Sequence, residues 1–413
     1  MKNSYAEILE YQQEPLNVIY IASYIPRKCG IATYTKDLTN AINLLNSRSM
    51  AEILVMHRAD SKTDYPWEAK YKVDDTNLAS FLGAADYINK SHANLVSLQH
   101  EFGLYGGNGG EYIVPLVESL KVPLVTTFHT VVADPDSNYG MVLRRIAARS
   151  EAIVVMMNQP ADRLVKYYGV PRKKIVVIPH GVPDLPFNNS RASKSKRRLT
   201  DRLVLGNINL LSPGKGIEYA LEAVAEISRQ YPEVLYLVIG QTHPDLLKAE
   251  GEKYRNYLKR RVRELDIRNN VRFINEYLSL NDLIDWLKTI DIYVTPYLDP
   301  QQVTSGALAY AIGAGKACVS TSYIYATEVL ADGRGVLVPF RDPGTIAKAV
   351  IGLQKNNTRR KDMQKKAYEY GRLMTWPNVA QSHLQLFRSV LHRHACQQPA
   401  DIHEDNFVPS VQP

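Results

Sequence analysis

Thr304, Ser305 and Gly306 form the segment that points most directly to a chemical role. They lie where an apolar, strand-like run ends and a helix of small residues should begin. The first turn of a helix has unpaired backbone N–H groups and the positive end of the helix dipole, which together bind anions. The segment therefore predicts an anion site flanked by two hydroxyl groups. An ordinary buried helix with a Ser/Thr cap is the alternative.

Lys215 is a second candidate contact for an anion. It follows Pro213 and Gly214, which predict a turn, and it stands at the expected start of a helix. A lysine there opposes the helix dipole, and a bound phosphate would remove that conflict. A solvated lysine at a helix start is the alternative.

His129 and Gly30 both follow predicted strands. In parallel α/β sheets, ligands bind beyond the carboxyl ends of the strands, so both residues are expected at a cleft. Gly30 permits a close approach of the backbone to a ligand, and the residues after it open a helix. A lone histidine is more often structural and a single glycine turn is weak evidence, but their positions favour a functional role.

A polar cluster follows the strand that precedes His129. The cluster consists of Gln99, His100, Glu101 and Tyr105. The glycines of the adjoining stretch, 103–110, indicate a shaped or mobile loop. The stretch lacks the lysine and hydroxyl of a phosphate-binding P-loop. The cluster is interpreted as the lining of a binding site, with a structural loop as the equal alternative.

The elements that hold these residues alternate between short apolar runs and amphipathic helical segments. This alternation predicts an α/β protein with parallel sheets covered by helices on both faces. A proline-rich passage and a basic run interrupt it near the middle, so two facing Rossmann-like, doubly wound domains with a cleft between them are expected. The expected boundaries are a first domain at 1–185, a basic linker at 186–201, a second domain at 202–375, a terminal helix at 376–395 that returns to the first domain, and a disordered tail at 396–413.

Composition narrows the functional class. The 413 residues carry a net charge of +8 at pH 7, which suits anionic ligands, and 45% of them are hydrophobic, as in soluble globular proteins. No apolar run reaches the ~18 residues that cross a bilayer. Three separated cysteines and the lack of a signal-peptide pattern favour the cytoplasm. No nucleic-acid module or metal-ligand spacing is evident. Peripheral contact with the inner membrane face, through Arg144, Arg145, Arg149 or the basic run, is a further expectation.

Taken in order, these segments resemble the motifs of glycosyltransferase family four, the retaining nucleotide-sugar transferases of GT-B fold. The resemblance covers roughly 18–376. The family carries Glu, seven residues and a second Glu ahead of a small-residue run and Gly-Lys. Here Gly315-Lys316 places Gln302 and Tyr310 at the two glutamate positions. The family's diphosphate-binding loop has an arginine five positions before its lysine, and that position is Leu210.

The resemblance implies a role for each candidate residue. Its second domain binds the nucleotide sugar and its first domain lies on the acceptor side. The implied catalytic residues are His129 and Lys215. The implied donor-binding residues are Gly30, Gln302, Thr304, Ser305, Gly306, Tyr310 and Glu328, of which Glu328 could instead pair locally. The implied acceptor-side residues are His100, Glu101 and Tyr105.

The resemblance also implies the reaction. A hexosyl group, mannosyl or glucosyl, would pass with retention from a GDP- or UDP-linked donor to a carbohydrate or glycolipid-type acceptor, without metal or other cofactor. Because both glutamates and the arginine are replaced, a sugar phosphorylase that uses inorganic phosphate stays open as an alternative. A nucleotide-sugar epimerase and a catalytically silent carbohydrate-binding subunit stay open as well.

Overall fold

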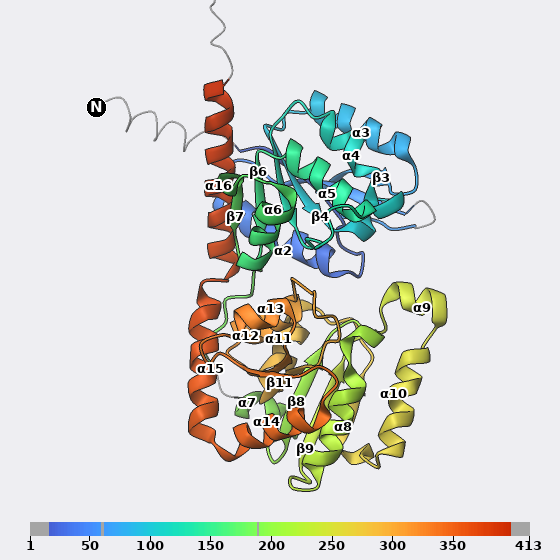
Figure 1. Ribbon diagram of the computed structural model, residues 1–413, viewed down its shortest axis with the longest axis vertical. Coiled ribbons are helices and arrows are strands. Elements are labelled where there is room, and N and C mark those ends of the chain that lie inside the picture. Colours follow the sequence, from blue (N-terminus) through green and yellow to red (C-terminus); the bar gives the residue numbers. More distant parts are fainter. Residues whose placement is uncertain (1–15, 59–61, 188–189, 398–413) are drawn as a thin grey trace, which may run out of the picture.

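The chain is built of two α/β domains. The computed structural model describes residues 16–58, 62–187 and 190–397. The two domains lie one above the other in Figure 1, and each contains one parallel sheet. The predicted pair of Rossmann-like domains is therefore confirmed.

The first domain has a seven-stranded sheet in the order β3-β2-β1-β4-β5-β6-β7. Its inner strands β1, β4 and β5 are buried along their whole length because helices cover both faces of a parallel sheet. The strands are β1 (Val18–Ala22), β2 (Glu52–His57), β3 (Ala69–Asp74), β4 (Leu95–His100), β5 (Leu124–Phe128), β6 (Ala152–Val155) and β7 (Ile175–Val177). The helices are α2 (Gly30–Leu45), α3 (Leu78–Lys90), α4 (Ile113–Glu118), α5 (Asn138–Arg149) and α6 (Asn158–Tyr168), with short 3-10 turns η1 (Phe102–Leu104), η2 (Asn108–Gly110) and η3 (Arg172–Lys174).

The second domain has a six-stranded sheet in the order β10-β9-β8-β11-β12-β13. Its strands are β8 (Leu203–Ile208), β9 (Val234–Ile239), β10 (Val271–Ile274), β11 (Ile292–Thr295), β12 (Ala317–Thr321) and β13 (Val336–Val338). Its helices are α7 (Arg191–Lys196), α8 (Ile217–Ser228), α9 (Pro244–Glu250), α10 (Lys253–Glu264), α11 (Leu280–Thr289), α12 (Gly306–Gly313), α13 (Ile324–Val329), α14 (Pro343–Lys355) and α15 (Asn357–Arg372), with 3-10 turns η4 (Pro213–Lys215) and η5 (Arg268–Asn270).

Both sheets reverse their strand order at one point, β1/β4 in the first domain and β8/β11 in the second. Ligands of doubly wound sheets bind at such switch points, beyond the carboxyl ends of the strands. Gly30 and Glu101 follow β1 and β4, whereas Lys215 and Gln302 follow β8 and β11. The topology thus directs candidate residues of both domains to the same region.

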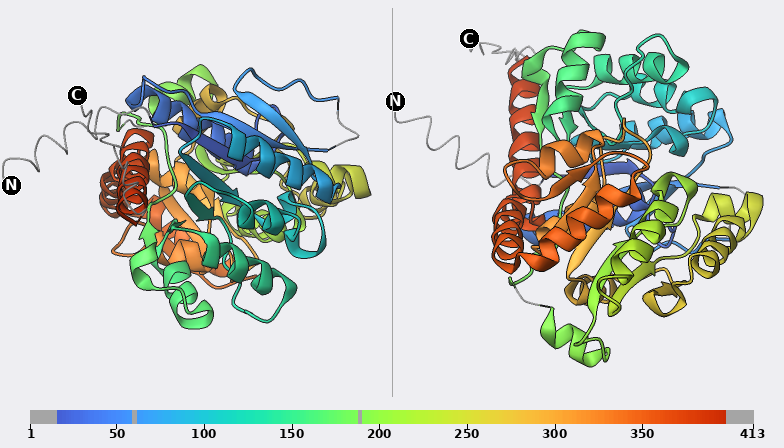
Figure 2. Two further views of the ribbon diagram at one scale, coloured as in Figure 1. Left: turned by 90° about the horizontal axis from the view of Figure 1, so that it is seen from above. Right: turned by 60° about the horizontal axis from the view of Figure 1, so that its bottom comes forward.

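The C-terminal helices join the two domains along one side of the molecule. Helix α15 packs on α12 of the second domain, and α16 (Trp376–Gln397) packs on α2 of the first. The two helices follow one another along that side in the views of Figure 1 and Figure 2. Phe387 of α16 lies in a core cluster with Tyr20 of β1, at a ring-centroid distance of 6.4 Å. Residues 398–413 of the expected disordered tail lie outside the described residues.

The central part of the expected basic linker is structured and belongs to the second domain. Helix α7 forms within it and packs on α11. The Lys194 ammonium is buried and lies 2.8 Å from a carboxylate oxygen of Asp291. The Arg197 guanidinium stacks over the Trp286 ring at 4.3 Å. Charge pairing and stacking therefore attach the segment to the second domain.

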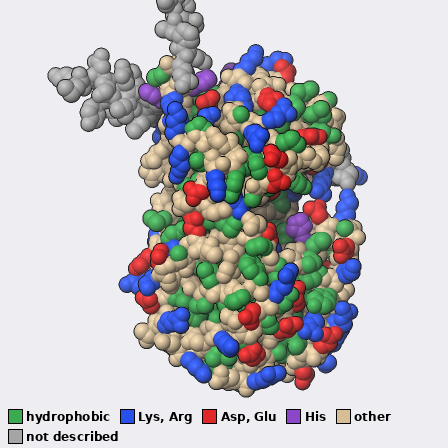
Figure 3. All heavy atoms as spheres, in the orientation of Figure 1, with side chains coloured by type: hydrophobic (Ala, Val, Ile, Leu, Met, Phe, Trp, Pro, Cys, Tyr) green, Lys and Arg blue, Asp and Glu red, His purple; other side chains and the backbone are tan. Residues whose placement is uncertain are grey.

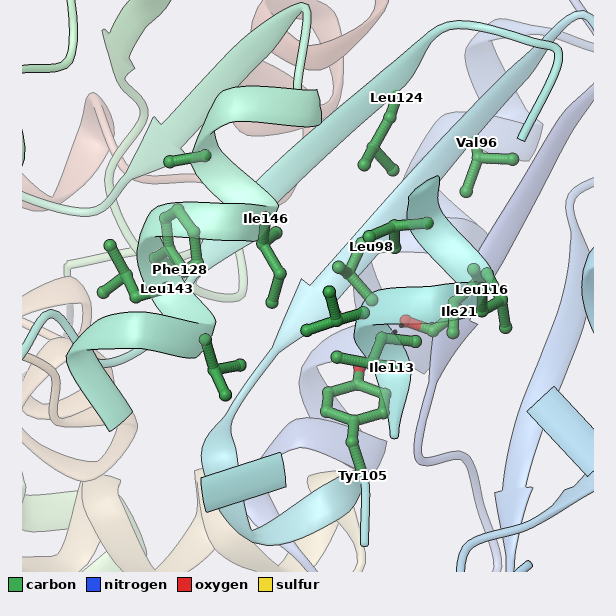
Figure 4. Close-up of a cluster of buried hydrophobic side chains, with 14 of the residues drawn as sticks. Ile21, Val96, Leu98, Tyr105, Ile113, Leu116, Leu124, Phe128, Leu143 and Ile146 are labelled. Atoms are coloured by element: carbon green, nitrogen blue, oxygen red, sulfur yellow. Dashed lines mark hydrogen bonds between the residues drawn. The ribbon is translucent and has the colours of Figure 1, made fainter. Parts of the chain in front are cut away.

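A hydrophobic core lies between the first sheet and the helices that cover it (Figure 4). Ile21, Leu98 and Phe128 come from three adjacent strands, and Ile113 and Ile146 come from α4 and α5. Within the described residues, no helix is both long enough and apolar enough to cross a membrane.

Candidate active site

A cavity of about 730 Å³ opens between the two domains. The surface drawn in Figure 3 is hollowed between its upper and lower halves. The first domain contributes Ile31, Glu101, His129, Thr130, Val131, Val132, Ala133, Asp134, Ser137 and Arg163, and the second contributes Lys215, Asp299, Gln301, Gln302, Val303 and Thr304. Because neither domain forms this cavity alone, its shape depends on how the domains close.

The cavity brings together five of the residues singled out in the sequence. They are Glu101, His129, Lys215, Gln302 and Thr304. Each follows the carboxyl end of a strand at or beside a switch point. The placement of this subset agrees with a ligand site between the domains.

His129 is a buried, neutral imidazole on the cavity wall. Its Nε2 lies 3.1 Å from Oε1 of Gln99, and its ring meets the ring of Tyr34 edge-on at 4.9 Å. Burial lowers the pKa of His129 to about 3, and the nearby His180 and His100 contribute to the decrease. The imidazole is therefore uncharged near neutral pH.

Lys215 presents its ammonium to the same cavity. It ends η4 directly before α8, and the ammonium lies over the Tyr297 ring, 4.1 Å from the centroid. No carboxylate among the described residues pairs with it. A cation supported only by an aromatic face remains available for an anionic ligand.

The start of α12 lies next to this lysine and histidine. Ser305 is the N-cap, and its Oγ accepts a hydrogen bond from the Leu308 N–H at 3.3 Å. Thr304 donates its hydroxyl hydrogen to the His129 carbonyl at 3.1 Å, and Gln302 donates from Nε2 to the Thr304 carbonyl at 2.9 Å. The predicted helix start is confirmed, and Thr304 ties it to the first domain.

Gly306 and Gly30 are the two glycines among the candidates. A Cβ at Gly306 would come within 3.0 Å of Nε2 of His180, so a larger residue would press on that ring. Gly30 is exposed, and a Cβ there would meet no atom within 4 Å. A side chain at Gly306 would therefore crowd His180, whereas the surroundings of Gly30 leave room for one.

Glu101 is one of two acidic residues, with Asp134, on the first-domain side of the cavity. One carboxylate oxygen accepts from the Phe102 N–H at 3.0 Å and the other from the Thr130 hydroxyl at 2.8 Å. Burial raises the pKa of Glu101, whereas these two hydrogen bonds act to lower it. The carboxylate can accept a hydroxyl from a ligand that enters this side.

His100 and Tyr105 do not line the cavity, which corrects their expected acceptor-side position. Both are fully buried in the first domain, with their rings stacked 5.7 Å apart. Tyr105 points into the hydrophobic cluster of Figure 4, and its hydroxyl donates to the Gln99 carbonyl at 2.6 Å. The two rings support the end of β4 from inside the core.

Tyr310 and Glu328 make contacts across the domain interface and lie outside the cavity lining. The Tyr310 hydroxyl donates to the Asp37 carboxylate of α2 at 2.9 Å, and burial raises the pKa of Tyr310. Glu328 accepts from the backbone N–H and side-chain amide of Asn158, at 3.0 and 2.9 Å. Glu328 therefore caps α6 of the facing domain, which agrees with the alternative that it pairs with protein groups.

Arg163 and Asp299 also belong to the site and were not singled out in the sequence, whereas Gln99 was noted as part of the polar cluster. The buried Arg163 guanidinium donates to the Val131 carbonyl at 2.8 Å and to the Gln301 side chain of the other domain. Arg163 lies in an amphipathic helix, where the sequence does not distinguish a buried arginine from a solvent-exposed one. Gln99 lies in the buried strand β4, and the sequence alone does not show that its amide contacts His129 rather than the cavity.

The arrangement can bind a phosphate-bearing ligand with neutral polar groups nearby. Lys215, Arg163 and the start of α12 supply positive charge or N–H groups, while His129 and Gln302 supply neutral hydrogen-bonding groups. Within the described ranges, no group of three or more His, Cys, Asp or Glu side chains could hold a metal ion.

Two family models match the chain, one on each domain. Residues 78–184 match the model described as Glycosyltransferase Family 4, and residues 189–370 match Glycosyl transferases group 1. D-inositol 3-phosphate glycosyltransferase 2 of Catenulispora acidiphila is 28% identical over 283 residues, which are 64% of this chain and 64% of that protein. Phosphatidyl-myo-inositol mannosyltransferase of Mycolicibacterium smegmatis is 25% identical over 216 residues, 52% of each chain. The chain thus spans under two thirds of the length of these relatives.

Solved structures share the fold over nearly the whole chain. Anabaena Alr3699/HepE, in complex with UDP and glucose, aligns with a TM-score of 0.70 at 13% identity and covers 91% of this chain and 100% of its own. Sucrose-phosphate synthase from Thermosynechococcus elongatus aligns with a TM-score of 0.73 at 16% identity, over 91% of this chain and 99% of its own.

Proposed function

This chain belongs to the GT-B glycosyltransferases of family four, and on that premise we propose that it transfers a hexosyl group from a nucleotide diphosphate sugar to a hydroxyl acceptor. The donor is linked to UDP or GDP, and the sugar is glucosyl or mannosyl. The acceptor is a carbohydrate or a glycolipid-type headgroup. Names of relatives that include glycosyl and mannosyl transfer to inositol compounds support this range.

One observation carries the proposal. Lys215 lines the same interdomain cavity as His129 and Thr304. Thr304 directly precedes the first turn of α12. A leaving diphosphate needs a cation and N–H donors, and a sugar needs neutral hydrogen-bonding groups beside them. The cavity between the domains offers both kinds of group.

We infer that the sugar–phosphate C–O bond breaks through an oxocarbenium-like state. Lys215 and the N–H groups at the start of α12 stabilise the negative charge that develops on the departing diphosphate. An oxygen of that diphosphate takes the proton of the incoming hydroxyl on the same face, so the anomeric configuration is retained. This chemistry does not call for a metal ion, because protein groups supply the positive charge.

His129 and Gln302 hold the sugar in this scheme, and Glu101 faces the acceptor. Closure of the two domains excludes water from the oxocarbenium-like state and so limits hydrolysis of the donor. The interdomain bonds of Thr304 and Arg163 support such a closed arrangement around the cavity.

A thermal-shift screen of the purified protein tests the proposal. The ligands are GDP, UDP, ADP, their glucose and mannose conjugates, inorganic phosphate and hexose phosphates. A ligand at about 100 times its dissociation constant stabilises the folded protein by ~2.7 kcal/mol. We expect one nucleotide and its sugar conjugate to raise the unfolding temperature, with no comparable effect of phosphate.

Stabilisation by inorganic phosphate or hexose phosphate alone would contradict the proposal. In that case the replacements at Leu210, Gln302 and Tyr310 would indicate phosphorolysis, because phosphate would take the place of the nucleotide. Release of sugar phosphate from an oligosaccharide would then be measured directly.

A further inference from the structure

We propose that Gln99 is a positioning residue that holds His129 as one neutral tautomer, with Nε2–H directed inward and the Nδ1 lone pair directed at the cavity. The inference deepens the proposed function and rests on it for the choice of ligand. A sugar group that docks on Nδ1 must donate a hydrogen bond. The site therefore takes a hexose that presents a hydroxyl there, and it disfavours a hexuronate that would place its carboxylate, which has no hydrogen to give, at the same point.

The geometry around Gln99 fixes the direction of this hydrogen bond. The Gln99 side chain is fully buried in β4, with Oε1 3.1 Å from His129 Nε2 and its amide nitrogen 3.4 Å from the Ser97 hydroxyl. The amide nitrogen donates to Ser97, so Oε1 faces the imidazole and can only accept. His129 Nε2 must therefore carry the hydrogen, and Nδ1 must be the lone-pair nitrogen.

Nδ1 of His129 is the ring nitrogen that remains accessible. Nδ1 makes no hydrogen bond to the described residues. The two ring nitrogens of His100 are also without a partner, but they are shielded from solvent, whereas Nδ1 of His129 is not. The His129 side chain is 4% exposed and lines the cavity. The accessible part of the ring therefore opens toward the expected ligand.

A purely structural role explains Gln99 poorly. An apolar side chain of similar size would pack in a fully buried strand without needing partners. The strand end is also held independently of the amide, because the Tyr105 hydroxyl bonds to the Gln99 backbone carbonyl at 2.6 Å. The amide itself is left with the imidazole as its main partner.

Charged and titratable groups surround His129 from several elements. They are Tyr34 on α2, His100 and Glu101 at the end of β4, Arg163 on α6, His180 in the interdomain segment and Lys215 on η4. Burial keeps His129, His100 and His180 neutral, so the two neighbouring histidines add no positive charge beside the His129 ring at neutral pH. The carboxylates of Glu101, Asp134 and Asp299 also line the cavity.

The test reads the tautomer directly by NMR of the full protein labelled with ¹⁵N-histidine. His129→Gln assigns the signal, and Gln99→Met and Gln99→Glu change the partner. We expect wild-type His129 to show the Nε2–H tautomer without titration between pH 5 and 8. In Gln99→Met the two tautomers mix, and in Gln99→Glu the carboxylate raises the pKa of His129 so that it titrates in this range.

His180 is an internal control in the same spectra. Its Nδ1 lies 2.8 Å from the Gly181 carbonyl, so it carries the opposite tautomer, and changes at Gln99 should leave it as it is. An Nδ1–H tautomer for His129 in the wild-type spectrum would overturn the inference. That spectrum needs no variant, so a poorly folded Gln99 variant does not block the test.

The substrate class is tested by binding of matched donor pairs, UDP-glucose against UDP-glucuronate and GDP-mannose against GDP-mannuronate. We expect the hexose of the preferred nucleotide to bind roughly 10-fold more tightly than its hexuronate, as for one hydrogen bond gained or lost. Gln99→Glu should remove this preference because a protonated His129 offers N–H to the carboxylate. Equal binding to the wild-type protein overturns the specificity. Absence of any nucleotide binding refutes the proposed function alone, because the NMR result is independent of it.

Discussion

The contact between Glu328 and Asn158 gives a prediction about how the two domains stay closed. Glu328 lies on α13 of the second domain, and its carboxylate accepts two hydrogen bonds from the backbone N–H and side-chain amide at the start of α6 in the first. It therefore acts as an N-cap that the facing domain supplies. A change of Asn158→Asp places a second carboxylate against it and should open the cleft.

The magnitude follows from the distances. The Asn158 amide lies 2.9 Å from the Glu328 carboxylate, so the introduced carboxylate lies close enough to repel it and removes one donor. At about 4 Å two charges interact by ~1 kcal/mol in water and ~4 kcal/mol near a protein surface, and the half-exposed site belongs near the lower figure. With about 1 kcal/mol for the lost hydrogen bond, closure should weaken by roughly 2 kcal/mol, or about 30-fold.

Donor-nucleotide affinity and interdomain distance measure this effect together. Fluorescence transfer between dyes on the two domains should report a more open Asn158→Asp variant, and its nucleotide affinity should fall because fewer molecules are closed. Adding Glu328→Gln to this variant should restore the interdomain distance and the nucleotide affinity, because the amide at position 328 can donate a hydrogen bond to the new carboxylate. Tryptophan fluorescence and unfolding controls check that each variant folds.

A direct nucleotide contact by Glu328 gives the opposite pattern. Glu328→Gln would then weaken nucleotide binding by itself, and the double variant would bind no better than Asn158→Asp. That result would refute the interdomain cap and return Glu328 to the donor site implied by the sequence resemblance.

Two further predictions concern stability. Lys194→Met leaves the partly buried Asp291 carboxylate without its ammonium partner and should lower the free energy of unfolding in urea by about 3 kcal/mol. Lys196→Met, at an exposed position of the same helix, should change it little, and equal effects of the two changes would contradict a stabilising pair. Burial lowers the pKa of His383 from 6.5 to about 4, so the unfolded state binds the proton first and stability falls as pH decreases through this window. At about 1.36 kcal/mol per pKa unit, His383→Leu should remove roughly 3 kcal/mol of that decrease in urea titrations at pH 7 and pH 4, while the exposed His92→Gln should leave the decrease in place.

The fold could be predicted because its signals are local. Short apolar runs alternate with amphipathic helices, and this alternation predicts a parallel α/β fold. His129, Lys215 and Thr304 could be placed for the same reason, since each directly follows a strand or starts a helix. In this topology, residues that follow the carboxyl ends of the strands near the switch point lie at the cleft.

The errors arise where position along a strand does not tell the cavity from the core. His100 ends β4 as His129 follows β5, yet His100 packs among aromatic rings and His129 lines the cavity. Both faces of a parallel strand are covered, so alternation carries no information about which side faces a ligand.

Contacts between the domains could not be predicted at all. The partners of Tyr310 and Glu328 lie in the other domain, 273 and 170 positions away in the sequence. Their pairing depends on how two separately folded units meet, which no local pattern encodes. The ion pair of Lys194 with Asp291 could not be predicted either, because a dense run of basic residues looks like a linker in the sequence.

The most direct test of the central claim is the turnover of Lys215→Ala with the nucleotide sugar that stabilises the wild-type protein. Loss of one group that stabilises a developing negative charge lowers kcat by about 100- to 1000-fold. We predict a loss of this size with an unchanged unfolding temperature, while Lys259→Ala, on the exposed face of α10, retains full turnover. Wild-type turnover by Lys215→Ala would contradict the assignment of this cavity as the site of glycosyl transfer.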